Sequence, residues 1–195
     1  FKLYLIKKTT ETAIFAFWNQ IIQKNMDIVI RKALSDDLER LMEIFDSARN
    51  FMQSVGNANQ WVNGYPQREL ICAEIEASHC YVCENDKGKI VATFSFIGEP
   101  DPNYSYIEGH WQNDGPYYVI HRLASDGSCR GIGQTCLDWC MERASNIRID
   151  THADNWVMQR LVERNGFLKC GIIYVANGTP RIAYQWIKSD IIKKS

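Results

Sequence analysis

A short glycine-containing loop between Ser128 and Gln134 carries the residues best suited to bind an anion. Gly131 and Gly133 have no side chain to block an approaching ligand, and Arg130 adds a positive charge. A stripe of apolar residues with helical spacing follows, formed by Ile132, Cys136, Leu137, Cys140, Met141 and Ala144. Because the first amides of a helix lack partners within it and its dipole favours negative charge there, the loop predicts a phosphate or pyrophosphate site.

Two common phosphate-binding patterns do not fit this loop. A Walker loop requires a Lys-Ser or Lys-Thr pair after its second glycine, and no such pair is present. The dinucleotide-binding fingerprint requires a third glycine, but Gly133 is followed by Gln134, Thr135 and Cys136. A tight turn that binds nothing is the remaining alternative to a phosphate site.

The loop resembles motif A of the GNAT superfamily of N-acetyltransferases, which has the pattern Gln/Arg-x-x-Gly-x-Gly/Ala. Gly131 and Gly133 occupy the glycine positions, and Arg130 stands where that family often has an arginine. Ser128 replaces the leading Gln or Arg, which is a departure from the pattern.

A second stretch resembles motif B of the same family, N-x-x-A-x-x-L-Y-E-x-x-G-F. The matching residues are Asn155, Leu161, Glu163, Gly166 and Phe167. Met158 replaces the alanine, and Val162 stands where many members carry a tyrosine that protonates the departing thiolate.

The resemblance extends over residues 27–187 and implies an α/β fold of the GNAT type. We expect a mixed, mostly antiparallel central sheet of about six or seven strands with helices on both faces. Two neighbouring parallel strands, 117–123 and 146–151, should splay apart and hold acetyl-CoA in the opening. The residues implied in binding it are Leu123, Ala124, Ser128, Cys129, Arg130, Gly131, Ile132, Gly133, Gln134 and Asn155.

The reaction implied by the resemblance is direct transfer of an acetyl group to a primary amine. The acceptor is a small molecule, a peptide N-terminus or a lysine. Two alternatives remain open, a non-catalytic module that binds acyl-CoA and a nucleotide-binding protein that uses the same loop.

The residues that move protons do not follow the family's pattern. Tyr117 occupies the position of a glutamate that some members carry on the central strand. The candidate catalytic residues are therefore Tyr174 as the acid, His121 and His152, with Glu99, Glu108 or water as further alternatives. A histidine has an ordinary pKa of about 6.5, which suits a general base. For each candidate the structural alternative is a side chain that only packs on the sheet.

Aromatic residues are the candidates for the acceptor side. Trp61 and Tyr65 lie in the polar loop 57–66, which borders the acceptor site in the GNAT fold. Trp111 lies in the long connection 98–116, and Tyr117 begins the central strand. Their alternative role is to anchor long loops.

The remaining elements expected from the sequence complete a single sheet. Capping and acidic residues at Ser35, Asp36 and Asp37 predict a helix start, and its apolar stripe runs from Leu38 to Phe51. The other expected elements are a strand at 27–32, helices at 67–77 and 155–165, and hairpins 79–84/89–97 and 168–175/181–187.

Bulk composition indicates an ordinary globular domain at residues 26–195. The chain has 195 residues, 46% hydrophobic and 23% charged, and a net charge of -1, which gives no electrostatic reason to expect nucleic acid. No apolar run approaches the ~20 residues of a membrane span. Residues 1–25 are interpreted as an extension, either upstream sequence or an addition from cloning, that contains a helix.

The seven cysteines favour a reducing, cytoplasmic location over a disulfide framework. Cys80 and Cys83 have C-x-x-C spacing, but residues three apart on a strand point to opposite faces. No second pair completes a zinc site, so we expect no metal. The expected partners are an amine acceptor and a second copy in a homodimer, with no nucleic acid and no membrane.

Overall fold

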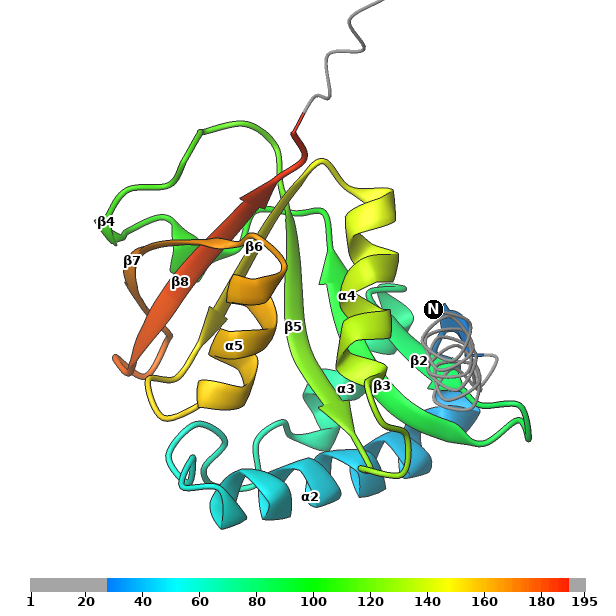
Figure 1. The fold of residues 1–195 in the computed structure, drawn as a ribbon. Coiled ribbons are helices and arrows are strands. Elements are labelled where there is room, and N and C mark those ends of the chain that lie inside the picture. The colour runs from blue at the N-terminus through cyan, green and yellow to red at the C-terminus, as the bar shows by residue number, and fades with distance from the viewer. Residues whose placement is uncertain (1–27, 190–195) are drawn as a thin grey trace, which may run out of the picture.

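The structure is a computed structural model that describes residues 28–189 (Figure 1). The predicted extension 1–25 lies outside the described residues. The helices are α2 (Leu38–Ser54), α3 (Arg68–Glu76), α4 (Ile132–Arg143) and α5 (Trp156–Arg164), with 3-10 turns η1 (Ser35–Asp37) and η2 (Pro102–Tyr104). The strands are β1 (Val29–Lys32), β2 (Cys80–Glu84), β3 (Ile90–Ile97), β4 (Glu108–Gly109), β5 (Tyr118–Ser125), β6 (Asn146–Thr151), β7 (Leu168–Tyr174) and β8 (Pro180–Ile187).

All these strands form one sheet in the order β1-β2-β3-β5-β6-β8-β7-β4. Every neighbouring pair is antiparallel except β5 and β6, which are parallel. This arrangement is the mixed, mostly antiparallel sheet that the sequence predicts. The prediction omitted β4, because a two-residue strand at the sheet edge leaves no periodic signal in the sequence.

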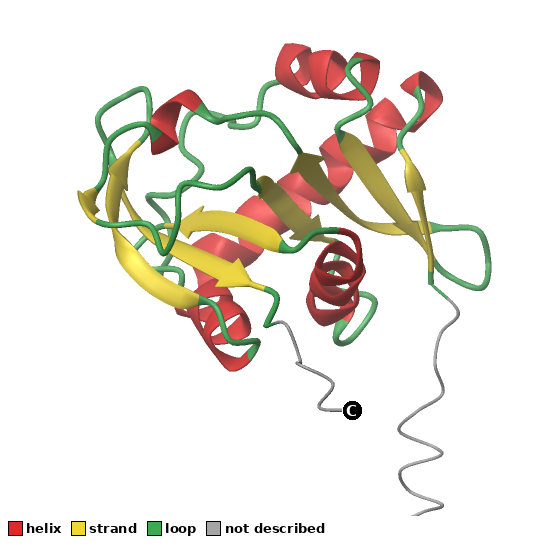
Figure 2. Ribbon diagram, turned by 90° about the horizontal axis from the view of Figure 1, so that it is seen from above, coloured by secondary structure: helices red, strands yellow, loops and turns green. Residues whose placement is uncertain are grey.

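Helices cover both faces of the sheet (Figure 2). On one face, α4 and α5 pack on a core that contains Cys136, Leu137, Cys140 and Val162. On the other face, α2 and α3 bury Leu41, Ile44, Phe45 and Ile71. Cys83 belongs to the first core and Cys80 to the second, as expected for residues three apart on a strand.

The parallel strands β5 and β6 pair only at one end. Tyr118 pairs with Ile147 and Val119 with Arg148, and no further pairs follow. Beyond this point β5 continues its pairing with β3 and β6 continues with β8, so the two halves of the sheet separate. The divergence of β5 from β6 can be followed in Figure 1, with α2 crossing below the opening. The predicted splay is therefore present.

The predicted helix boundaries agree with the structure to within a few residues, but one residue of the α2 stripe differs. Phe51 is 52% exposed, while Ala48 and Met52 take the buried positions on that turn. Among the described residues, none of the helices combines the length and apolar character needed to cross a bilayer.

Candidate active site

The splay between β5 and β6 opens onto a large cavity. Its volume is about 1160 Å³. One part of its wall is the loop before α4, including Cys129, Gly131 and Gly133. The wall also includes His121 and Leu123 from β5, so a single cavity joins the predicted phosphate site to the middle of the sheet.

The main chain before α4 has the form required to bind an anion. Gly131 is the N-terminal cap residue of α4 and has a positive φ of 79°. A Cβ atom there would meet nothing within 4 Å, so this side of the loop is open. Among the described residues, the amides of Cys129, Arg130 and Gly131 donate no hydrogen bond, whereas the Gln134 amide donates to the carbonyl of Gly131 at 2.9 Å. The loop therefore offers a run of free N–H groups at a helix N-terminus, which fits a pyrophosphate group.

A smaller hollow of about 290 Å³ adds positive charge to this end. It is lined by Gly131 and Gly133, and also by Arg160 and Arg164 of α5. Arg164 donates to the Gln134 side chain at 2.9 Å, so Gln134 fixes this arginine beside the loop. The two arginines lie one turn apart in the sequence and were not predicted as site residues.

His121 stands between two carboxylates at the other end of the cavity. Its Nε2 lies 2.6 Å from Asp101 Oδ2, and its Nδ1 lies 3.8 Å from Asp150 Oδ1. Tyr104 donates a hydrogen bond to Asp150 at 2.7 Å. Burial raises the pKa of the Asp101 carboxyl, but the hydrogen bond and charge of His121 outweigh this, and the pKa is lowered. The imidazole therefore lies on the cavity wall in contact with a carboxylate that fixes its orientation, the arrangement that a general base needs.

A bulge in β5 shapes the wall next to His121. Ser95 pairs with His121 and Thr93 with Ala124, so Arg122 and Leu123 together oppose a single residue of β3. Arg122 has a positive φ of 53°, which is strained for a residue other than glycine. An ion pair with Glu74 of α3, at 2.5 Å, holds the Arg122 side chain in this position.

The loop 57–66 closes the cavity from the α2 side and places two of the predicted aromatic residues on its wall. Trp61 and Tyr65 both line the cavity, with ring centroids 6.2 Å apart. Asn155 also lines it, but both ends of its side-chain amide are used. Its oxygen accepts from the Met158 amide as a helix cap, and its nitrogen donates to Gln60 at 2.8 Å. Asn155 thus joins α5 to the loop 57–66.

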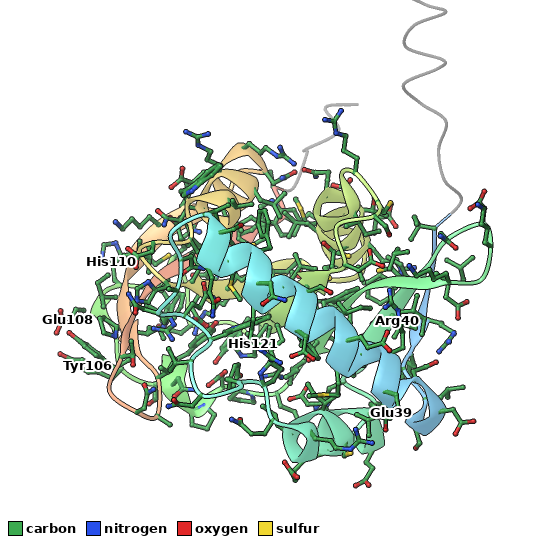
Figure 3. All side chains as sticks on the ribbon, turned by 90° about the horizontal axis from the view of Figure 1, so that it is seen from below. Glu39, Arg40, Tyr106, Glu108, His110 and His121 are labelled. Atoms are coloured by element: carbon green, nitrogen blue, oxygen red, sulfur yellow. The ribbon has the colours of Figure 1, made fainter. Side chains whose placement is uncertain are left out.

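Tyr174 and His152 do not line the cavity. The Tyr174 hydroxyl donates to Glu108 at 2.8 Å, and its side chain is exposed. Figure 3 shows Glu108 at the outer edge of the molecule and His121 near its middle. His152 accepts a hydrogen bond from the Asp154 amide in the turn after β6. The edge of the sheet and the turn carry these two residues away from the cavity, so the structure does not bring them together with His121.

Five of the other predicted residues do not line the cavity, and one of them, Gln134, lines the smaller hollow instead. The Tyr117 hydroxyl accepts from the Asp101 amide at 3.3 Å and so helps to place the partner of His121. The Trp111 ring stacks on Arg148 in a separate cluster. The Ser128 amide and hydroxyl both donate to Asp126, and Arg130 is exposed and is not part of the cavity wall.

The comparisons with known proteins agree with this geometry. The profile of the acetyltransferase (GNAT) family matches residues 38–167. The chain belongs to the GNAT acetyltransferase family. Members of this family are acyl-transfer enzymes, and they typically use acetyl-CoA.

Solved structures of GNAT acetyltransferases superimpose on most of the chain. One from Streptococcus agalactiae is 30% identical, with a TM-score of 0.75, and the match covers 83% of this chain and 96% of that one. One from Listeria monocytogenes is 17% identical, with a TM-score of 0.64, and the match covers 82% and 94%. The second likeness concerns the fold alone. A search of curated protein sequences found no significant match.

Several site residues of this GNAT protein were missed in the sequence. Asp101 and Glu74 come from segments that contain no motif. Arg122 directly follows the candidate His121, and Asp150 lies two residues before the candidate His152. Only the pairing of strands and the loop before β4 bring them together. Among residues 28–189, no cluster of three or more His, Cys, Asp or Glu side chains has the arrangement of a metal site.

Proposed function

We propose that the protein transfers the acetyl group of acetyl-CoA directly to a primary amine. One observation carries the proposal. A single cavity joins the free amides before α4 to His121 with its two carboxylates. The first feature suits the phosphates of acetyl-CoA, and the second suits removal of a proton from an amine.

The residues proposed to hold acetyl-CoA belong to the loop before α4 and to the part of β5 that borders the splay. The amides from Cys129 to Gly133 would hold the pyrophosphate, and Leu123 and Ala124 would lie along the pantetheine arm. When bound, acetyl-CoA supplies an acetyl thioester. The edge of β5 beyond Val119 lacks a strand partner on the side of β6, so its main chain is free to donate hydrogen bonds to the thioester carbonyl.

His121 takes the proton that the amine nitrogen must lose when it bonds to the acetyl carbon. The carbon–sulfur bond breaks in exchange, and the sulfur receives a proton from His121 or from water. Asp101 holds the imidazole through Nε2 at 2.6 Å, which leaves Nδ1 directed toward Asp150. Val162 has no acidic group and is fully buried in the core, so the helix α5 supplies no acid at that position.

The test is acetyl transfer by the full chain to a panel of primary amines, followed by release of free thiol. Amine-dependent release of thiol with acetylated product is the expected result. A parallel thermal-shift measurement compares acetyl-CoA, ATP and NAD at equal concentration. Binding of acetyl-CoA without transfer to any amine would favour the non-catalytic acyl-CoA-binding module, and a larger shift with ATP or NAD would favour a nucleotide-binding protein.

A further inference from the structure

Arg181, near the start of β8, is a buried cation that faces the cavity. It is 7% exposed and belongs to the cavity wall. Its Nη atoms donate to the carbonyl oxygens of Pro180 at 3.0 Å and Gln60 at 3.3 Å. Within residues 28–189, no carboxylate lies within ion-pair distance of it. Burial lowers its pKa, and the charge of Asp150, which does not contact it, offsets this only in part. A buried charge that no carboxylate contacts is costly, so this position favours the arrival of an anion.

Asp150, on β6, is the matching anion. Its side chain is 11% exposed and lines the same cavity. Oδ1 accepts from Tyr104 and lies near His121, while Oδ2 makes no hydrogen bond among the described residues. Asp150 lies directly opposite Ala183 of β8, and Ala183 stands two residues after Arg181 on that strand. Because side chains two residues apart on a strand share a face, the side chains of Asp150 and Arg181 lie on the same face of the sheet.

The other buried charges at this end of the cavity already have partners. His121 is held by Asp101 at 2.6 Å, and Arg122 by Glu74 at 2.5 Å. Asp150 and Arg181 are left as opposite charges that line one cavity without contacting each other. This arrangement is complementary to a molecule that carries both an amine and an acidic group.

We propose that the acceptor is an amine that also bears a carboxylate, namely an amino acid or a short peptide. Its carboxylate pairs with Arg181, and its amine lies at Asp150 within reach of His121. Arginine suits this role because its planar fork binds a carboxylate through two donors. This assignment rests on the proposed acetyl transfer and names the class of amine that the transfer serves.

The experiment compares each amino acid with its own amide, which keeps the side chain and the amine but removes the carboxylate. Glycine, leucine, phenylalanine and lysine are assayed beside their amides and beside 1,5-diaminopentane. Binding of the same compounds is followed by calorimetry, which does not depend on turnover. We expect the acids to exceed their amides in kcat/KM by roughly 10- to 100-fold, the range of a charged hydrogen bond.

Arg181→Met should remove this preference by lowering kcat/KM and affinity for the acids while leaving the amides within about threefold of their starting values. Arg181→Lys, which keeps the charge without the fork, should retain part of the preference. The matched control is Arg148→Met. Arg148 is a similarly buried arginine on the same sheet, stacked on Trp111 and Tyr117 outside the cavity, and its loss should preserve the preference.

Equal activity toward acids and amides, or a preference for the diamine, would overturn the assignment of Arg181 while leaving the acetyltransferase function intact. An equal loss for acids and amides in Arg181→Met would also overturn it. Failure to acetylate any amine would instead remove the proposed function. In that case, binding of amino acids that depends on Arg181 would still support the pairing of their carboxylate with Arg181.

Discussion

The two ends of the cavity are built in different ways. The end proposed to hold acetyl-CoA is made mainly by consecutive residues, from Cys129 to Gly133, at the start of α4. The acceptor end draws one residue each from separate segments, including Asp101, His121, Asp150 and Arg181. A phosphate cradle needs only main-chain amides and a helix end, whereas acid–base chemistry needs side chains from several directions.

The two ends also differ in charge. Arg160 and Arg164 line the hollow beside the loop before α4, and Arg130 is part of the loop itself. These charges give that end a positive character suited to phosphates. The acceptor end combines several carboxylates with the cations Arg122 and Arg181, and Arg122 forms an ion pair with Glu74. Variants at one end should therefore change the use of one substrate only.

The largest effect is expected for His121→Gln. Loss of a general base lowers kcat by about 10²- to 10⁴-fold, while the affinity for acetyl-CoA stays near its starting value. Steady-state kinetics with both substrates measure this. His152→Gln and Tyr174→Phe are the controls, since both residues lie outside the cavity. A turnover of His121→Gln equal to that of the controls would separate this histidine from the mechanism.

Gly131→Val tests the other end. A side chain at Gly131 would occupy the open side of the loop, and we expect affinity for acetyl-CoA to fall by at least about tenfold. Gly88→Val is the matched control, because Gly88 has a φ of 70° and equally open surroundings in the β2–β3 turn. Both variants should lose similar stability, of roughly 1–2 kcal/mol, from left-handed strain. Equal acetyl-CoA affinity in the two, measured by calorimetry, would show that the loop does not bind phosphate.

Gly133 is less suitable for this test. A Cβ atom there would lie 3.3 Å from Cδ2 of Leu161, so a larger residue disturbs the packing of α5 as well as the loop.

Asn155 lies where the two ends meet, and its variants should give smaller effects. Asn155→Ala removes the helix cap and should lower the free energy of unfolding by about 1 kcal/mol. Asn155→Ser keeps a capping oxygen but loses the hydrogen bond to Gln60. We expect it to retain stability and to raise the KM for the amine by a few-fold, since Gln60 belongs to the acceptor loop. A rise in the KM for acetyl-CoA alone would instead indicate that Asn155 contacts that substrate.

The smallest effect concerns the pH dependence of stability. Because the pKa of Asp101 is lowered in the folded protein, its carboxylate stabilises the fold above its unfolded pKa of about 3.9. This contribution is lost as the pH falls through the lowered folded pKa. Asp101→Asn should therefore show a shallower loss of unfolding free energy on acidification, measured by urea titration between pH 7 and pH 3. Only part of the slope should disappear, since the pKa values of Asp37 and Asp126 are lowered too. An unchanged slope would contradict the proposed stabilisation of Asp101 by His121.

The fold and the form of the loop before α4 were largely predictable from the sequence. The helix α4 and the loop before it are read directly from the glycines and the apolar stripe, because helix ends and periodicity are local properties. The splay followed from the family resemblance, and the pairing of β5 with β6 confirms it.

The acceptor end was decided by the tertiary structure. The sequence favoured Tyr174 as the acid and offered His121 and His152 beside it, since each is a titratable side chain on or near a strand. The sheet places His121 beside Asp101 and Asp150, carries Tyr174 to the outer edge, and leaves His152 in a turn. Asp101 and His121 are 20 residues apart, and Arg181 lies 31 residues beyond Asp150. Local sequence determines where strands and loops begin and end, but only the packing of distant segments determines which side chains share a cavity.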